Sequence, residues 1–291
     1  MQLKSILLSL AAAATCQAAA VVNHEICGTP PPSEAYLQAI RESAAEEAAA
    51  VANANVKRDV RYIKTYVHII ASDSSRSGGN INDDTVASQI KVLNSDFQYS
   101  GYQFTLQNIS RTIDSSWSDI WSNADLRSLK RSLRNGDYAD LNIYYFRRIT
   151  APNRNHLTGF CTYPGVISTW DDFYNDGCCL DVETTPGGSF KPYNLGKITS
   201  HEVGHWFGLI HPWGNNNTGG CTNGNDLVDD TAPQDYAVYG CNEQSHTCSS
   251  SPYYDPVHNI MGYSDNSCVN QFTQGQYARM YSQFDKYRTV H

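Results

Sequence analysis

The sequence has no excess of basic residues and, after its first 20 residues, no long apolar run. Its 21 Lys and Arg residues stand against 29 Asp and Glu residues in 291, a formal net charge of −8. Nucleic acid binding needs a concentrated basic surface, so this balance argues against such a partner. A membrane-spanning helix needs about 20 apolar residues, so we expect no membrane-bound mature chain. The apolar fraction of 41% is ample for one large domain or two small ones.

The first 20 residues have the features of a secretory signal. Lys4 precedes an apolar run from Ile6 to Ala14, and small residues follow at positions 18–20. We therefore expect residues 1–20 to be a signal peptide, removed from a secreted, extracellular protein. The alternative is a short buried helix.

Cysteine content and two sequons fit this interpretation. Of nine cysteines, Cys16 lies within the expected signal, which leaves an even number for an oxidising compartment. Asn108 and Asn216 each begin an Asn-x-Ser/Thr sequon and could accept N-glycans. Either could equally be an unmodified loop asparagine.

The chemical signature of the chain is residues 201–211, His-Glu-Val-Gly-His-Trp-Phe-Gly-Leu-Ile-His. His201 and His205 are four residues apart, so on a helix both imidazoles project from one side and can hold one zinc ion. Glu202 would miss the metal but reach a water bound to it, as a general base does. Gly208 allows the chain to leave the helix and bring His211 round as a third ligand. Three protein ligands with an open fourth position are typical of a catalytic zinc site.

Residues 21–58 differ in composition from the rest. An alanine- and glutamate-rich stretch over 33–54 favours a helix but offers few core-forming side chains, and the dibasic pair Lys57-Arg58 follows it. We expect residues 21–58 to be a propeptide of a zymogen and residues 59–291 to be the catalytic domain. Its upper part would extend to about residue 208 and its lower part from about 209 to 291.

Cys27 is the candidate inhibitory switch within this propeptide. A thiolate bound to the open position of the zinc would keep the enzyme silent until export. The alternative is that Cys27 pairs in a structural disulfide.

The remaining pattern predicts an α/β (α+β) fold with a twisted, mostly parallel sheet. Strands are expected over 61–71, 102–113 and 141–149, with short ones near 165–168 and 179–184. Helices are expected from Asp83-Asp84, as the cap, to about 99, and over 125–134, 194–208 and 273–287. Residues 212–270 lack such periodicity, which indicates long loops held by disulfides.

The cysteines near residue 170 leave alternatives open. Cys161 is expected to pair with Cys178 or Cys179, which cannot readily pair with each other because neighbours on a strand point to opposite faces. The third thiol would be free or joined to Cys27.

Asn259-Ile-Met-Gly-Tyr263 adds a family resemblance. With the zinc motif, it makes the chain resemble the metzincin metallopeptidases, and within them the small secreted fungal and microbial enzymes of the pappalysin type. The resemblance covers roughly residues 61–289 and also rests on the segment 224–233 and on the four C-terminal cysteines. It implies a cleft between an upper sheet-and-helix part and an irregular, disulfide-stapled lower part that carries a C-terminal helix.

The resemblance also implies roles for particular residues. Met261 would form the turn beneath the metal, and the hydroxyl of Tyr263 could stabilise the oxyanion of the reaction. Two disulfides, Cys221–Cys248 and Cys241–Cys268, are implied by the family pattern. A structural calcium site with Asp226 and Thr231 is implied as well; the alternative there is a solvated acidic loop.

These observations favour a secreted, monomeric zinc endopeptidase that cleaves proteins or peptides. An exopeptidase would need an anchor for a chain terminus, and none is readable. A gluzincin could use Glu243 as its third ligand, and a catalytically silent binding protein could share the fold. The intact zinc motif and Met261 argue against both.

Overall fold

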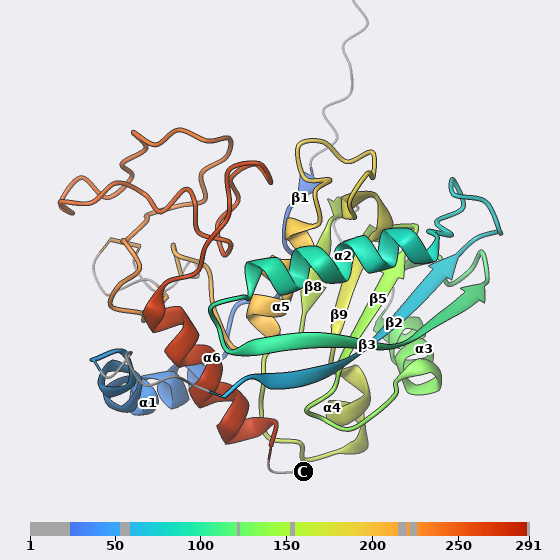
Figure 1. Cartoon of the computed structure of the whole chain (residues 1–291), viewed down its shortest axis with the longest axis horizontal. Coiled ribbons are helices and arrows are strands. Elements are labelled where there is room, and N and C mark those ends of the chain that lie inside the picture. Colours follow the sequence, from blue (N-terminus) through green and yellow to red (C-terminus); the bar gives the residue numbers. More distant parts are fainter. Residues whose placement is uncertain are drawn as a thin grey trace, which may run out of the picture.

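The computed structural model describes residues 24–52, 59–120, 123–151, 155–214, 220–221 and 226–289. Its centre is a five-stranded sheet in the order β3-β2-β5-β9-β8, in which only β8 is antiparallel to its neighbour. The strands are β2 (Arg61–Ala71), β3 (Tyr102–Ile113), β5 (Leu141–Phe146), β8 (Gly159–Cys161) and β9 (Cys178–Asp181). The predicted mostly parallel α/β fold is confirmed (Figure 1).

Helices cover both faces of this sheet. On β2, Val67 and Ile69 pack in one cluster with Val86 of α2 (Asp83–Asp96) and Val203 of α5 (Lys197–Trp206). Ile70 points to the opposite face, where it packs with Leu129 of α3 (Asn123–Leu133). This alternation follows from the two-residue period of a strand. A short helix, α4 (Trp170–Asn175), packs beside α3.

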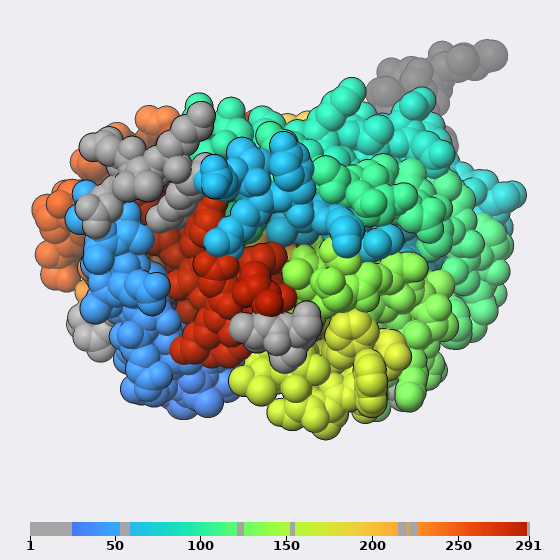
Figure 2. Space-filling model, turned by 60° about the horizontal axis from the view of Figure 1, so that its bottom comes forward, coloured from blue at the N-terminus to red at the C-terminus, as the bar shows by residue number. Residues whose placement is uncertain are grey.

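A second, small sheet joins the N-terminal segment to the body. Its order is β1-β7-β6-β4, formed by β1 (His24–Glu25), β7 (His156–Leu157), β6 (Arg148–Thr150) and β4 (Asp119–Ile120). β1 runs parallel to β7. After β1, the helix α1 (Glu34–Ala52) packs against the C-terminal helix α6 (Gln274–Tyr287). Figure 2 shows the blue surface of α1 beside the red surface of α6.

The lower part is irregular, as predicted. Between α5 and α6, the described residues contain no helix or strand, and one isolated bridge joins Asn259 to Gln271. The disulfides Cys221–Cys248 and Cys241–Cys268 lie in this part. Within the described part of the chain, no helix is both long and apolar enough to cross a membrane.

Several predicted element boundaries were wrong. Residues 165–168 form no strand; the edge strand β8 lies earlier, because only residues 159–161 pair with β9. The stretch expected over 179–184 is β9 followed by a 3-10 turn, η1 (Val182–Thr184). Asn82, rather than Asp83-Asp84, caps α2, since its side chain accepts the Thr85 N–H. The zinc-motif helix starts at Lys197, because Gly196 before it has a positive φ of 84°.

Candidate active site

Helix α5 and the turn after it carry the zinc motif. His201, Glu202 and His205 are at most 2% exposed, because α5 lies between the sheet and the lower part. The chain leaves the helix at Gly208, whose φ of 98° is accessible to glycine but strained for other residues. This turn brings His211 beside the two helical histidines, as the spacing predicts.

The three histidines converge through their Nε2 atoms. The Nε2 atoms of His201, His205 and His211 lie 3.1–3.2 Å from one another. The Nδ1 of His201 is 2.8 Å from the Ile260 carbonyl oxygen, and that of His205 is 2.8 Å from the Leu209 carbonyl oxygen. A carbonyl only accepts, so each Nδ1 carries the proton and each Nε2 is left with a free lone pair.

Burial keeps these imidazoles neutral. Desolvation lowers the pKa of His201 to about 4 and places those of His205 and His211 well below their usual range. Three neutral imidazoles whose Nε2 atoms meet at one point form a donor set suited to zinc. The residues present therefore fit the metal that the sequence implies.

Glu202 is buried beside this cluster. Desolvation raises the pKa of its carboxyl to about 8. Its Oε2 accepts a 2.9 Å hydrogen bond from the Thr29 hydroxyl, and its Oε1 has no partner among the described residues. A carboxyl with a pKa near neutrality is suited to accepting and returning a proton.

Met261 and Tyr263 both lie close to the zinc motif. Met261 is fully buried beneath α5, and a Cβ placed on Gly204 would come within 2.4 Å of its sulfur. The Tyr263 hydroxyl is 3.5 Å from the His211 Nε2. Trp213 stacks on the His211 ring at 4.6 Å and meets the Tyr263 ring edge-on at 4.6 Å.

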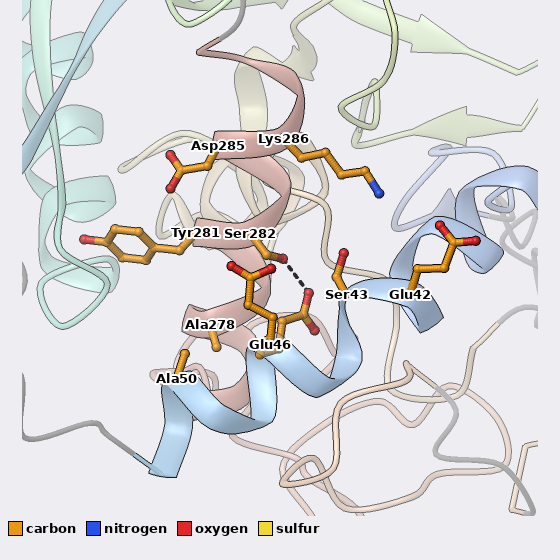
Figure 3. Close-up of a pocket in the computed structure, with 10 residues that line it drawn as sticks. Glu42, Ser43, Glu46, Ala50, Ala278, Tyr281, Ser282, Asp285 and Lys286 are labelled. Carbon is orange, nitrogen blue, oxygen red and sulfur yellow. Dashed lines mark hydrogen bonds between the residues drawn. The ribbon is translucent and has the colours of Figure 1, made fainter.

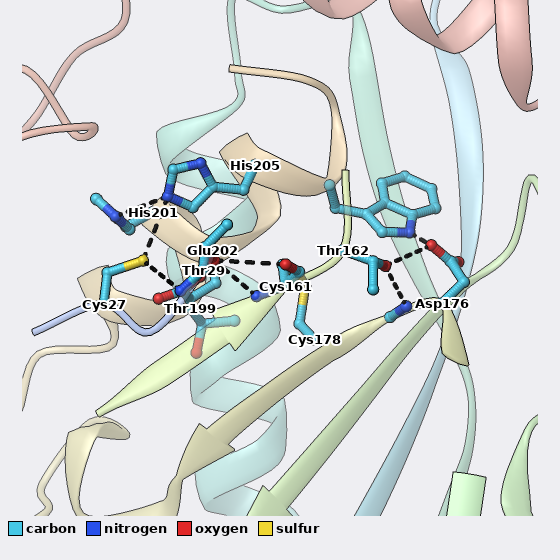
Figure 4. The surroundings of a disulfide bond; sticks show 12 residues. Cys27, Thr29, Cys161, Thr162, Asp176, Cys178, Thr199, His201, Glu202 and His205 are labelled. Atoms are coloured by element: carbon cyan, nitrogen blue, oxygen red, sulfur yellow. Dashed lines mark hydrogen bonds between the residues drawn. A yellow bond between two sulfur atoms is a disulfide. The ribbon is translucent and has the colours of Figure 1, made fainter. Parts of the chain in front are cut away.

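The N-terminal segment reaches into this site. The Sγ of Cys27 is 3.4 Å from the His205 Nε2 and belongs to the same potential metal-binding group as the three histidines. Thr29 hydrogen-bonds to Glu202 and also accepts the Cys161 N–H at 2.9 Å (Figure 4). The Gly28 N–H donates to the Gly159 carbonyl at 2.8 Å, so the segment lies along the edge strand β8.

The other candidate residues lie away from the histidines. Cys161 is bonded to Cys178, one of the two partners that the sequence allowed, and Cys27 and buried Cys179 are unbonded. Glu243 pairs with His258 at 3.3 Å and is not in the histidine cluster, so the gluzincin alternative has no ligand there. Asn108 is exposed on β3; Asn216, Lys57-Arg58 and residues 1–20 lie outside the described residues.

Asp226 and Thr231 come together in one loop of the lower part. Asp226 Oδ2 and Thr231 Oγ1 are both buried, and the two side chains interact with each other; within the described residues, no third group hydrogen-bonds to either atom. Burial raises the pKa of Asp226 to about 7. These two oxygens are buried, and both are of the hard type that calcium prefers.

Two residues at the site were not predicted. Thr29 follows Cys27 by two positions, but nothing in the local sequence shows that it would face Glu202. Trp213 follows His211 by two positions, and only the turn after Gly208 makes it a neighbour of both His211 and Tyr263. The aromatic type of Trp213 directly after the motif was the one available signal.

Fold and site together define a zinc-type metallopeptidase of the metzincin class. The family model described as "Pregnancy-associated plasma protein-A" (peptidase M43) matches residues 190–285. A protein of Pyricularia oryzae named "Extracellular metalloprotease" is 40% identical over 98% of this chain and 97% of its own length. The chain therefore belongs to this family, the pappalysins, and is an extracellular metalloprotease.

Two solved structures have a fold similar to that of this chain. Mature mirolysin of Tannerella forsythia in complex with a cleaved peptide has a TM-score of 0.66 and 26% identity, over 79% of this chain and 93% of that one. A promirolysin mutant of Tannerella forsythia, at 24% identity, has the same TM-score of 0.66 over 91% of this chain and 95% of that one. The first likeness extends the family relation to a solved fold, and the second concerns the fold alone.

Proposed function

We propose that His201, His205 and His211 hold one catalytic zinc ion and that Glu202 is the general base of an endopeptidase. The observation that carries this proposal is the convergence of three Nε2 lone pairs at 3.1–3.2 Å beside a buried carboxyl. Zinc in such a site supplies a Lewis acid, which polarises a carbonyl and lowers the pKa of water.

The side chains perform the proton transfers. Glu202 takes a proton from the attacking water and then gives it to the leaving amine, which a pKa near neutrality favours in both directions. The Tyr263 hydroxyl, which lies 3.5 Å from the His211 Nε2, donates a hydrogen bond to the oxygen on which negative charge develops. Met261 packs against α5 at Gly204, between the two helical histidines, and so helps to hold this helix in position.

Replacing His211 tests the ligand set. His211→Ala should lose zinc, because two imidazoles alone leave an incomplete donor set, whereas Glu243→Ala should keep it. The zinc content of the purified proteins, measured by mass spectrometry of metals, gives the answer. Retention of a full equivalent of zinc by His211→Ala would contradict the proposed ligands.

We further propose that residues 21–58 are an inhibitory propeptide, removed after the Lys57-Arg58 pair. Cys27 lies at the histidine cluster and Thr29 binds Glu202, so the segment covers both the metal position and the base. Burial and the charge of Glu202 raise the pKa of the Cys27 thiol, and a bound cation would favour its thiolate.

We propose a structural calcium ion at Asp226 and Thr231. Their buried oxygens have no third hydrogen-bonding partner among the described residues and are hard ligands of the type calcium prefers. Calcium should raise the melting temperature of the wild type and not that of Asp226→Asn, measured by calorimetry after removal of metals with a chelator. An equal shift in both proteins would contradict this site.

The remaining features are proposals from the sequence. We propose that residues 1–20 are a signal peptide, that Asn108 and Asn216 are glycosylation sites, and that the mature protein is a monomer. Mass spectrometry of the secreted protein, before and after removal of glycans, would test the first two. Sedimentation would test the third.

A further inference from the structure

A buried ion pair fastens α1 to α6. Arg279 of α6 is fully buried, and its Nε lies 2.7 Å from the Glu47 Oε2 on α1. Ser282 donates to the other carboxylate oxygen of Glu47. Within the described residues, Glu47 is the only carboxylate in ion-pair distance of Arg279. The other polar contacts of this guanidinium are the carbonyl oxygens of Asp226 and Leu227.

The first half of α1 packs on the zinc motif. Leu37 and Ile40 are buried in a cluster with Ile210, which lies between the second and third histidines of the motif. The Tyr36 hydroxyl donates to the Gly208 carbonyl at 3.0 Å. The surface under α1 is therefore apolar near the active site. Further along it carries the buried guanidinium of Arg279, with acidic side chains as well as Lys286 around the contact.

The second half of α1 fits this surface loosely. A cavity of about 480 Å³ opens between α1 and α6, lined by Ser43, Glu46 and Ala50 on one side and by Tyr281 and Asp285 on the other (Figure 3). A cavity of about 310 Å³ lies on the other side of Glu47, between Ala48 and Val228. Here α1 presents mainly alanine side chains, so one ion pair provides most of the specific contact.

We propose that the surface covered by α1 is a binding site for this amphipathic helix, recognised by its Glu47 carboxylate and its apolar first half, and that α1 remains bound there after the chain is cut. The proposal rests on the proposed function of residues 21–58 as a removable segment. Loss of α1 would separate Arg279 from its carboxylate, and a bound helix without this carboxylate would leave the guanidinium buried and unpaired, which is unfavourable. The surface therefore selects a helix with a carboxylate at the position of Glu47 and apolar side chains at those of Leu37 and Ile40. A helix with larger side chains than alanine in its second half would fill the two cavities.

Retention of the cut segment tests this inference. The full chain, with Glu202→Ala and Cys27→Ala and a specific protease site in place of Lys57-Arg58, is folded, cut and passed over a sizing column in chelator. In this variant, contacts of Glu202, Cys27 or a bound metal cannot hold the cut residues 21–58 on the body. We expect the cut segment to co-elute with the body, and Glu47→Gln to speed its loss at least about tenfold, as removal of one partner of a buried pair does.

Glu46→Gln is the matched control, because it removes the same charge from an exposed neighbour. A synthetic peptide of residues 33–52 in excess should displace the segment, and its Glu47→Gln form should do so at least about tenfold less well. The peptide comparison leaves the folding of the body unaffected. Immediate loss of every cut segment, or equal behaviour of the Glu47 and Glu46 variants, would overturn the proposal. Casein hydrolysis by the wild type is scored separately, so failure of the protease assignment does not decide this result.

Discussion

Burial lowers the pKa of four histidines among the described residues, and three of them face one another. His201, His205 and His211 turn their Nε2 atoms to a common point, whereas His68 lies on β2 with no other histidine in its contacts. His68 is held by Ser110 at 2.7 Å and by Asn142 at 3.0 Å. Burial thus keeps the three clustered imidazoles neutral, as a metal ligand must be, and it keeps His68 neutral inside the core.

The low pKa of His68 predicts that the free energy of unfolding decreases in acid. Its pKa falls from 6.5 to about 4 on burial. The unfolded chain binds this proton more readily, so the stabilisation is complete above pH 6.5 and is lost as the pH falls towards 4, by about 3 kcal/mol. Denaturant unfolding of His68→Gln should therefore depend less on pH in this window than that of the wild type. Parallel pH curves for the two proteins would contradict this.

The contact between Gly204 and Met261 predicts a second residue-level effect. A Cβ on Gly204 would lie 2.4 Å from the Met261 sulfur. Gly204→Ala should therefore cost about 1–3 kcal/mol by overpacking, although alanine is favoured over glycine in a helix. Adding Met261→Ala should recover part of this cost, which a double-mutant cycle of unfolding free energies measures. Additive effects would mean that the turn and the helix do not touch as described.

At the scale of elements, the N-terminal segment is part of the folded body. β1 pairs with β7, Thr29 binds Glu202, and α1 packs on α6. The segment therefore contacts the body through main-chain pairing, through side chains at the histidine cluster and through a packed helix.

The proposal that residues 21–58 are an inhibitory propeptide gives a prediction for the uncut protein. Cys27→Ala in the unprocessed chain should raise hydrolysis of an internally quenched peptide at least about tenfold, because a loss of about 1.4 kcal/mol in the closing contact already has that effect. Thr29→Val should raise it less, since it removes one hydrogen bond to Glu202. If the uncut Cys27→Ala protein hydrolyses the peptide no faster than the uncut wild type, the thiol is not needed for inhibition, and the other contacts of residues 21–58 are sufficient.

The elements differ in how far their sequence specifies them. β2 and β3 were predicted to the residue, because long runs of β-branched and aromatic side chains leave little choice. β8 was misplaced, since a three-residue edge strand is defined by its pairing with β9 and has no local pattern. α1 was predicted as a helix, but its docking was not, because that depends on Tyr36, Leu37, Ile40 and one buried ion pair.

For the molecule as a whole, the upper part is held by its core and the lower part by covalent links. The main hydrophobic cluster joins the sheet, α2, α5 and α6, and also includes Ile260 and Met261 from the lower part. The cysteine pairings follow the family pattern, whereas local sequence could not have specified them. The zinc motif was readable because its ligands lie within eleven residues, and Cys27 was a candidate because it is the one cysteine of residues 21–58. The contact of Thr29 with Glu202 was not readable, because it spans more than 170 residues.

The disulfides of the lower part should therefore dominate its stability. Cys221 and Cys248 are 27 residues apart, so the double change Cys221→Ala/Cys248→Ala should cost about 2–4 kcal/mol by releasing the unfolded chain. Calorimetry of the purified variant measures this loss. An unchanged melting temperature would show that loop packing or a bound cation holds this part instead.

The proposed zinc site and its base are tested most directly by measuring zinc content together with casein hydrolysis. Both are measured on the wild type and on Glu202→Ala, each after cleavage behind Lys57-Arg58. We predict about one zinc ion in each protein, because Glu202 is not a ligand, and hydrolysis by the wild type alone. Hydrolysis by Glu202→Ala at the wild-type rate would contradict the assignment of the base. Zinc in the wild type without any hydrolysis, with and without calcium, would contradict the proposed catalytic centre.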